Sequence, residues 1–180
     1  MVSVIQKGLV IGGGVAGMTA ALKLAEQGYE VFLLEKEPQL GGNLRNLLYT
    51  LEGEDVQAFL KELIGKVTNH PLIHVITNAL VVDFSGSKGN FSTGVMVAPT
   101  MYYRKIEHGI TILATGAEEW KPTEYLYGQD PRIVTQLELE NRIAHQPSEV
   151  AQANQVVMIQ CVGSRNEERP YCSRTCCATA

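Results

Sequence analysis

Apolar runs and glycines alternate over the first 34 residues in a pattern that predicts a βαβ unit. Residues 8–11 form a short apolar run that leads into a glycine cluster, as buried parallel strands do. Between Val15 and Gln27 apolar residues recur at helical spacing, and Gly28 supplies the stop. Residues 30–34 then form a second apolar run. A strand, a helix and a strand in such close succession predict a right-handed βαβ unit.

The middle of the chain carries one amphipathic helix and a series of short strands. Apolar residues at helical spacing predict the helix over residues 55–68. The short central strands predict an antiparallel meander that lies over the parallel sheet. Runs typical of strands follow the helix, and a last helix is expected, at residues 73–76, 80–84, 91–97, 101–106 and 109–114 for the strands and around residues 136–144 for the helix.

These elements predict the α/β fold class, with a parallel sheet, helices on both of its faces and a small antiparallel β layer. We expect this Rossmann-type domain to occupy residues 1–145. Residues 146–155 have the composition of a linker and residues 156–159 restart as a strand, so residues 146–180 are expected to hold the start of a second α/β unit. Residues 176–180 are helical in composition without a stop signal, which indicates a chain cut from a longer protein.

Composition and charge argue against several classes of function. The 180 residues carry a net charge of −4, which argues against a nucleic-acid-binding surface. No apolar run approaches the roughly 20 residues of a membrane span. The N-terminus lacks the features of a secretory signal, so we expect a cytoplasmic protein. The four histidines are scattered, and no side chain stands out as an acid–base or nucleophilic catalyst.

The turn after the first strand carries a nucleotide-binding pattern. Gly12, Gly14 and Gly17 match G-x-G-x-x-G, which provides a tight turn, a close approach for a pyrophosphate and close packing of the helix on the sheet. The helix that begins there directs N–H groups and its positive dipole end toward a phosphate. Glu35 ends the second strand, where an acceptor for ribose hydroxyls is expected. This pattern predicts a dinucleotide site but does not decide between flavin and nicotinamide.

Two further stretches favour a flavin. Residues 40–42 read Leu-Gly-Gly, and residues 111–116 are a buried strand that ends in Ala-Thr-Gly, although ordinary turns are the alternative for each. With the βαβ unit, they resemble the FAD domain of the two-dinucleotide-binding flavoproteins, such as thioredoxin reductase, over about residues 7–125. The resemblance implies that the residues around FAD are Gly12, Gly14, Val15, Ala16, Gly17, Glu35, Lys36, Gly41, Gly42, Ala114, Thr115 and Gly116.

All four cysteines lie close together near the end of the chain, at Cys161, Cys172, Cys176 and Cys177. In a cytoplasmic protein such a cluster indicates metal binding or redox chemistry before structural disulfides. The C-x10-C-x3-C-C spacing matches neither a zinc ribbon nor a ferredoxin. Thiolates near a helix N-terminus suit an iron–sulfur cluster, and redox-active thiols or inert buried cysteines are the alternatives.

Two sequence phrases are similar to the family of heterodisulfide reductase A subunits: Gln-Cys-Val-Gly-Ser-Arg at residues 160–165 and Tyr-Cys-Ser-Arg-Thr-Cys-Cys at residues 171–177. The resemblance implies a [4Fe–4S] cluster held by Cys161, Cys172, Cys176 and Cys177 beside the FAD of the full-length protein. It also implies an FAD-dependent electron-transfer oxidoreductase, with flavin-based electron bifurcation as one form of its activity. Other heterodisulfide reductase-like subunits, or a redox partner protein, are the expected partners, and the isolated chain is expected to be inactive.

The alternative function is that of a pyridine nucleotide-disulfide oxidoreductase that uses a cysteine pair. Cys172 and Cys176 are separated by three residues, whereas such pairs are normally separated by two or four. The turn after residues 156–160 keeps only Gly163 of a second fingerprint, so the usual nicotinamide site is not written there. A non-catalytic scaffold with the same fold is a third interpretation.

Overall fold

The computed structural model describes residues 4–172, 174 and 176–179. It divides into two compact units, the first ending at Ala117 and the second beginning at Glu118. The domain boundary that the sequence predicts at residue 145 stays a prediction. Among the described residues, no helix combines the length and the apolar character that a membrane span requires.

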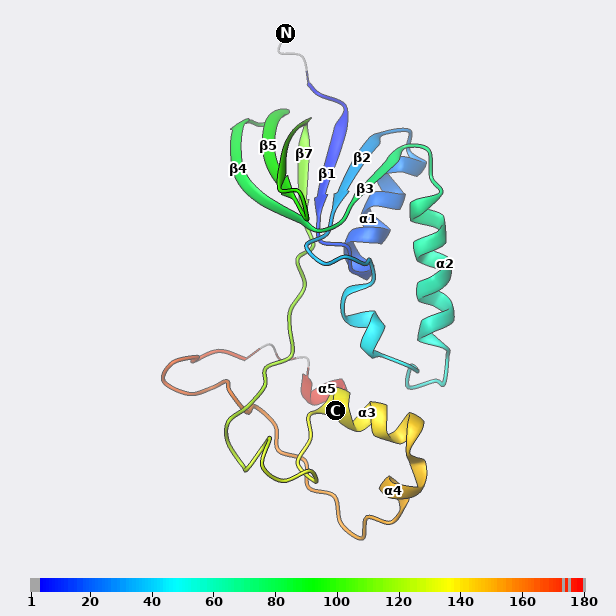
Figure 1. Ribbon diagram of the computed structural model, residues 1–180, viewed down its shortest axis with the longest axis vertical. Helices are drawn as coiled ribbons and strands as arrows, with labels where there is room; N and C mark the ends of the chain where they lie inside the picture. Colours follow the sequence, from blue (N-terminus) through cyan, green and yellow to red (C-terminus); the bar gives the residue numbers. More distant parts are fainter. Residues whose placement is uncertain (1–3, 173, 175, 180) are drawn as a thin grey trace. The chain divides into compact units, whose positions relative to one another are not determined.

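A four-stranded parallel sheet forms the centre of the first unit (Figure 1). Its strands are short and mostly apolar because both faces of the sheet are covered, as in parallel sheets generally. Lys7 pairs with Glu30, and the register continues to Ile11 and Leu34, which confirms the predicted βαβ unit. The order β3-β2-β1-β7 joins β1 (Lys7–Ile11), β2 (Glu30–Leu34), β3 (Ile73–Ile76) and β7 (Ile110–Leu113).

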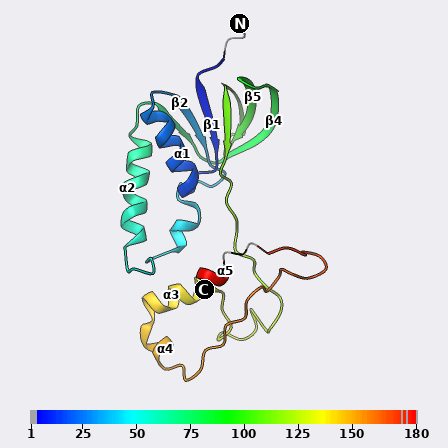
Figure 2. The same cartoon turned by 180° about the vertical axis from the view of Figure 1, so that it is seen from behind.

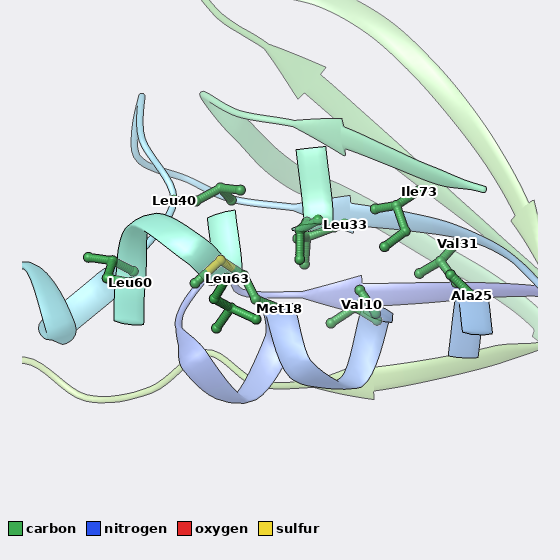
Figure 3. Close-up of a cluster of buried hydrophobic side chains, with 11 residues drawn as sticks. Val10, Met18, Ala25, Val31, Leu33, Leu40, Leu60, Leu63 and Ile73 are labelled. Carbon is green, nitrogen blue, oxygen red and sulfur yellow. The ribbon is translucent and has the colours of Figure 1, made fainter. Parts of the chain in front are cut away.

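The helices of the first unit, α1 (Val15–Glu26) and α2 (Val56–Thr68), cover one face of the parallel sheet (Figure 2). Asp55 caps α2 by accepting a hydrogen bond from the backbone N–H of Ala58 at 2.9 Å. Figure 3 shows how side chains from both helices meet those of the strands. This core consists of Val10, Met18, Ala21, Ala25, Val31, Leu33, Leu40, Leu60, Leu63, Val67 and Ile73.

The opposite face of the parallel sheet is covered by an antiparallel layer with the strand order β4-β5-β6 (Figure 1). Its strands are β4 (Ala79–Ser87), β5 (Asn90–Val97) and β6 (Tyr102–His108). A second core lies between the two sheets and includes Leu9, Phe32, Leu34, Val95 and Ile106. The neighbours of these strand residues, such as Val10 and Leu33, face the helices instead, because side chains alternate along a strand.

The predicted fold class is confirmed, with one difference in the arrangement of its layers. In the described part of the first unit both long helices cover the same face, whereas helices were expected on both faces. The three antiparallel strands occupy the face where further helices were expected, because their own apolar side supplies the cover. The antiparallel meander itself is confirmed, and β4 extends to Ser87 rather than ending at Phe84.

A buried polar pair stands within the antiparallel layer. His108 is fully buried, and its Nε2 lies 2.8 Å from the hydroxyl of Thr93. Its Nδ1 lies 3.0 Å from the carbonyl oxygen of Ile110, so Nδ1 donates the hydrogen and Nε2 accepts from the hydroxyl. Burial lowers the pKa of His108 from its usual 6.5, and the bond to Ile110 opposes part of that shift. The imidazole is therefore held neutral and structural.

The second unit is organised around α3 (Gln136–His145), which confirms the helix expected near residues 136–144. Thr135 and Glu138 form a reciprocal capping box at its start. Residues 156–159 were predicted to be a strand, and this prediction is wrong: they are exposed and form no regular element. An apolar run needs a neighbouring strand to satisfy its backbone, and the described residues provide none there. Two short helices, α4 (Pro147–Ala151) and α5 (Cys176–Thr179), complete this unit.

Candidate functional site

Three separate segments meet at the glycine turn that follows β1. The N–H of Gly12 donates to the carbonyl of Leu34 at 2.8 Å, which ties the turn to the end of β2. The N–H of Gly41 donates to the carbonyl of Gly13, also at 2.8 Å. On the other side, the N–H of Ala114 donates to Ile11 at 2.8 Å and continues the pairing of β7 with β1. The three motifs singled out in the sequence therefore come together at the carboxyl end of the parallel sheet.

The glycines of the fingerprint differ in what surrounds them. Gly12 has φ +113°, and a Cβ built there would overlap the carbonyl oxygen of Ala114. A Cβ on Gly17 would overlap the carbonyl oxygen of Gly12, so the helix packs directly against the turn. A Cβ on Gly14, by contrast, would meet no atom within 4 Å. Gly12 and Gly17 are thus required by the fold itself, whereas the space beside Gly14 is open to a ligand.

Gly13 is a constrained position that sequence reasoning missed. A Cβ at Gly13 would lie 2.8 Å from Oε2 of Glu35 and would also collide with the side chain of Leu40. Its backbone N–H donates to that same Oε2 at 2.6 Å. Three consecutive glycines were the available signal, since the pattern G-x-G-x-x-G asks for only the first and the third of them.

The first turn of α1 presents its backbone N–H groups at this junction. The helix begins at Val15, its N-cap Gly14 is extended, and no side chain caps the first turn. Val15 and Ala16 are exposed, and the first turn contains no acidic residue. Backbone N–H groups at a helix start, together with the helix dipole, attract an anion such as a phosphate.

The carboxylate of Glu35 lies under the turn and is nearly buried, with 7% of the residue exposed. Oε2 accepts from the N–H of Gly13 at 2.6 Å, and Oε1 accepts from the N–H of Glu37 at 2.8 Å. An ionised carboxylate has about four acceptor positions, so both oxygens keep room for a further donor. The neighbouring Lys36 is exposed, and its Nζ lies 3.9 Å from a carboxylate oxygen of Glu37.

The second glycine pair packs against the first. Gly41 has φ +124° and forms an isolated bridge with Gly14, and a Cβ on Gly42 would lie 3.2 Å from the Cα of Gly14. The pair leads into η1 (Gly42–Asn46), a single 3₁₀ turn. After β7, Thr115 and Gly116 are exposed, and Gly116 has φ +67° with open space at its Cβ position. The predicted cofactor residues are thus neighbours, although their roles stay predictions.

The predicted cluster ligands do not assemble in the same way. Cys161 is partly buried with φ +63°, Cys172 is exposed, and Cys176 and Cys177 lie on α5. Within the part of the chain that the structure describes, these four cysteines form no disulfide. Nor do the described residues contain a group of three or more histidine, cysteine or acidic side chains placed to hold a metal ion. The predicted ligand set therefore stays a prediction from spacing and resemblance.

The comparisons with known proteins agree with this geometry. The model of the NAD(P)-binding Rossmann-like domain family matches residues 10–63, which run from β1 through most of α2. The first of two iron-sulfur A subunits of CoB–CoM heterodisulfide reductase from Methanopyrus kandleri is 32% identical, with 94% of this chain and 39% of that protein covered. The chain is a relative of the heterodisulfide reductase A subunits. It spans about two fifths of the length of that relative.

Solved structures extend the likeness to the first unit's fold. L-proline dehydrogenase of P. horikoshii has a TM-score of 0.53 at 26% identity, covering 64% of this chain and 23% of that one. Thioredoxin reductase of Lactococcus lactis has a TM-score of 0.54 at 21% identity, covering 68% of this chain and 40% of that one. The second likeness shows the fold alone. The resemblances predicted from the sequence, to the heterodisulfide reductase A subunits and to the thioredoxin reductase fold, are both confirmed.

Proposed function

We propose that this relative of the heterodisulfide reductase A subunits is the FAD-binding part of an electron-transfer oxidoreductase. The observation that carries the proposal is the contrast among the fingerprint glycines. Gly12 and Gly17 are closed off by backbone, whereas the position of Gly14 is open and lies at the start of α1. An open backbone position at an uncapped helix start suits a pyrophosphate, which supplies two negative charges.

The residues present fit the ADP half of FAD. Val15 and Ala16 offer N–H groups at the start of α1, and Glu35 offers acceptor positions for a ribose diol. Gly41 and Gly42 bring backbone close to Gly14 without side chains that would fill the space. Once bound, FAD supplies two-electron acceptance and stepwise release of single electrons. The chain's own part is to bind and orient the cofactor.

The proposal includes a [4Fe–4S] cluster in the full-length protein, with Cys161, Cys172, Cys176 and Cys177 as its ligands. The support is the soft thiolate donor set, which iron–sulfur clusters use, and the words "iron-sulfur subunit" in the name of the relative from Methanopyrus kandleri. The described residues do not bring the four thiols to one point. No electron-transfer step is therefore derived through the cluster. Other members of a heterodisulfide reductase-like complex are the proposed partners, and flavin-based bifurcation is the form of activity to test once they are in hand.

The proposal is tested by Gly14→Val in the full-length protein, with Gly65→Val on α2 as the matched control. Both positions leave a Cβ free of contacts within 4 Å, so neither valine should disturb the fold. We expect Gly14→Val to purify without flavin, because the branched side chain would fill the space beside the helix start, and Gly65→Val to purify yellow. A yellow Gly14→Val protein with the full flavin content would refute the assignment of the turn.

A second candidate function, disulfide exchange through a cysteine pair, is distinguished by the absorption spectrum of the purified protein. Flavin bands with a broad shoulder from an iron–sulfur cluster support electron transfer. Flavin bands alone favour the disulfide reductase, and the absence of any chromophore favours a scaffold. Cys172 is exposed and the N–H of Arg174 lies 3.4 Å from its Sγ, which is the observation that keeps a reactive thiol in view.

A further inference from the structure

One cationic side chain lies at the glycine junction and is not part of any predicted motif. Arg45 belongs to η1, three residues after the second glycine pair. Its Nε donates to the carbonyl oxygen of Leu40 at 2.7 Å, so the side chain folds back over the loop that carries it. A Cβ built on Gly41 would lie 3.0 Å from Cγ and 3.1 Å from Nε of Arg45. The arginine therefore packs directly on the glycine that is bridged to Gly14.

The loop beneath Arg45 is held from α2. The side-chain amide of Gln57 donates to the carbonyl of Leu44 at 2.8 Å and also to the carbonyl of Leu47. The backbone N–H of Val56 donates to the carbonyl of Leu48 at 3.0 Å. These bonds fix both flanks of the arginine to a helix whose apolar side is in the core. Holding a charged group before the ligand arrives reduces the entropy that binding would otherwise lose.

The charge of Arg45 is also available to a ligand. A guanidinium has five N–H donors, and the bond from Nε to Leu40 uses one of them, which leaves four on the terminal nitrogens. Arg45 is exposed, so those nitrogens are accessible. Lys36, a second cation near this junction, has its Nζ beside the carboxylate of Glu37. A planar guanidinium suits phosphate oxygens because it can donate two parallel hydrogen bonds.

We propose that Arg45 is a positioning residue for the pyrophosphate of the bound dinucleotide, opposite the N–H groups at the start of α1. This inference rests on the proposed function, since it names a further contact of the same site. The stem of Arg45 also accounts for the glycine at position 41: a side chain there would displace the guanidinium from the junction. The pyrophosphate would then lie between a helix dipole and a fixed cation.

The test is calorimetric titration of the full-length apoprotein with FAD and, separately, with ADP. We expect Arg45→Ala to weaken both ligands by ~3- to 30-fold, because both carry the pyrophosphate. Arg45→Lys keeps the charge but loses the planar fork, so an intermediate loss is expected. Lys66→Ala removes the same charge from an exposed position on α2 and should leave both affinities unchanged. Raising the salt concentration should weaken FAD binding to the wild type more than to Arg45→Ala, because salt screens the lost attraction.

The outcomes separate the inference from the proposed function. Normal FAD and ADP affinities in Arg45→Ala, together with weakened binding in Glu35→Ala, would overturn the role of Arg45 alone. No dependence of FAD binding on Glu35, Gly14 or Arg45 would overturn the proposed function as well. If Arg45→Ala unfolds at a lower temperature than the wild type, the comparison of Arg45→Lys with wild type decides: affinity and salt dependence closer to wild type than to alanine would support the role of the charge, and a loss as large as that of alanine would support a purely structural bond to Leu40.

Discussion

Replacing Glu35 with alanine should destabilise the glycine turn and weaken FAD binding at the same time. The carboxylate accepts hydrogen bonds from the N–H of Gly13 at 2.6 Å and from the N–H of Glu37 at 2.8 Å. Gly13 is buried, so its N–H would lose its partner without gaining water, whereas Glu37 is exposed and its N–H can be solvated. One unsatisfied buried donor costs about 1–3 kcal/mol. We therefore expect the free energy of unfolding to fall by about 2 kcal/mol.

The loss of FAD affinity adds to that effect. A hydrogen bond from a ribose hydroxyl to an ionised carboxylate contributes about 1.5–3 kcal/mol, which corresponds to roughly ten- to a hundredfold in dissociation constant. Glu35→Gln keeps the size of the side chain and one carbonyl acceptor, so both losses should be smaller. Glu37→Ala changes only an exposed side chain beside Lys36 and serves as the control, with an expected change within about 0.5 kcal/mol.

Two measurements check the prediction for Glu35. Urea unfolding gives the free energy of unfolding of each variant, and titration of the apoprotein with FAD gives the dissociation constant. A Glu35→Ala protein with unchanged FAD affinity would remove Glu35 from the ribose site. Unchanged unfolding free energy would in addition contradict the argument that its carboxylate satisfies the buried N–H of Gly13.

Three further predictions concern other parts of the chain. Gly17→Ala should lower the melting temperature, unlike Gly14→Val, because its Cβ would overlap the turn; equal melting temperatures would contradict this. Changing Cys176 or Cys177 to serine should lower the iron and acid-labile sulfide of the anaerobically reconstituted full-length protein, and normal contents would restrict the ligand set. His108 has a lowered pKa through burial, so its stabilising effect is complete above pH 6.5, the pKa of an unperturbed histidine, and is lost as the pH falls below it. The melting temperature should therefore fall between about pH 7 and 5, and by less in His108→Gln.

The parts of the fold set by local periodicity could be predicted from the sequence. The β1-α1-β2 unit follows from two apolar runs on either side of a helical pattern, and Asp55 marks the start of α2 as a side-chain cap. The cover of the parallel sheet could not be predicted in this way. An apolar face on β1 accepts either a helix or another sheet, and only the three-dimensional arrangement decides which one lies there.

The candidate site shows the same division. Gly12, Gly14, Gly17 and Glu35 belong to a pattern whose spacing encodes its geometry, so they could be singled out at once. Arg45 belongs to no pattern, because its position at the junction depends on the 3₁₀ turn and on the bonds from Gln57. The strand expected at residues 156–159 failed because an apolar run indicates a strand only when a partner strand is available.

The carbonyl of Ala114 has a consequence for the order in which the protein acquires its binding site. It closes the space over Gly12, although the two residues are about a hundred positions apart in the sequence. During synthesis the fingerprint emerges first, with every residue of the motif already present and the strand that shapes it still unmade. Contacts between such distant residues form late because the intervening chain must first be brought together. We therefore expect a nascent chain to carry the motif long before it can hold a nucleotide, and a product stopped before β7 to contain the signature without the site.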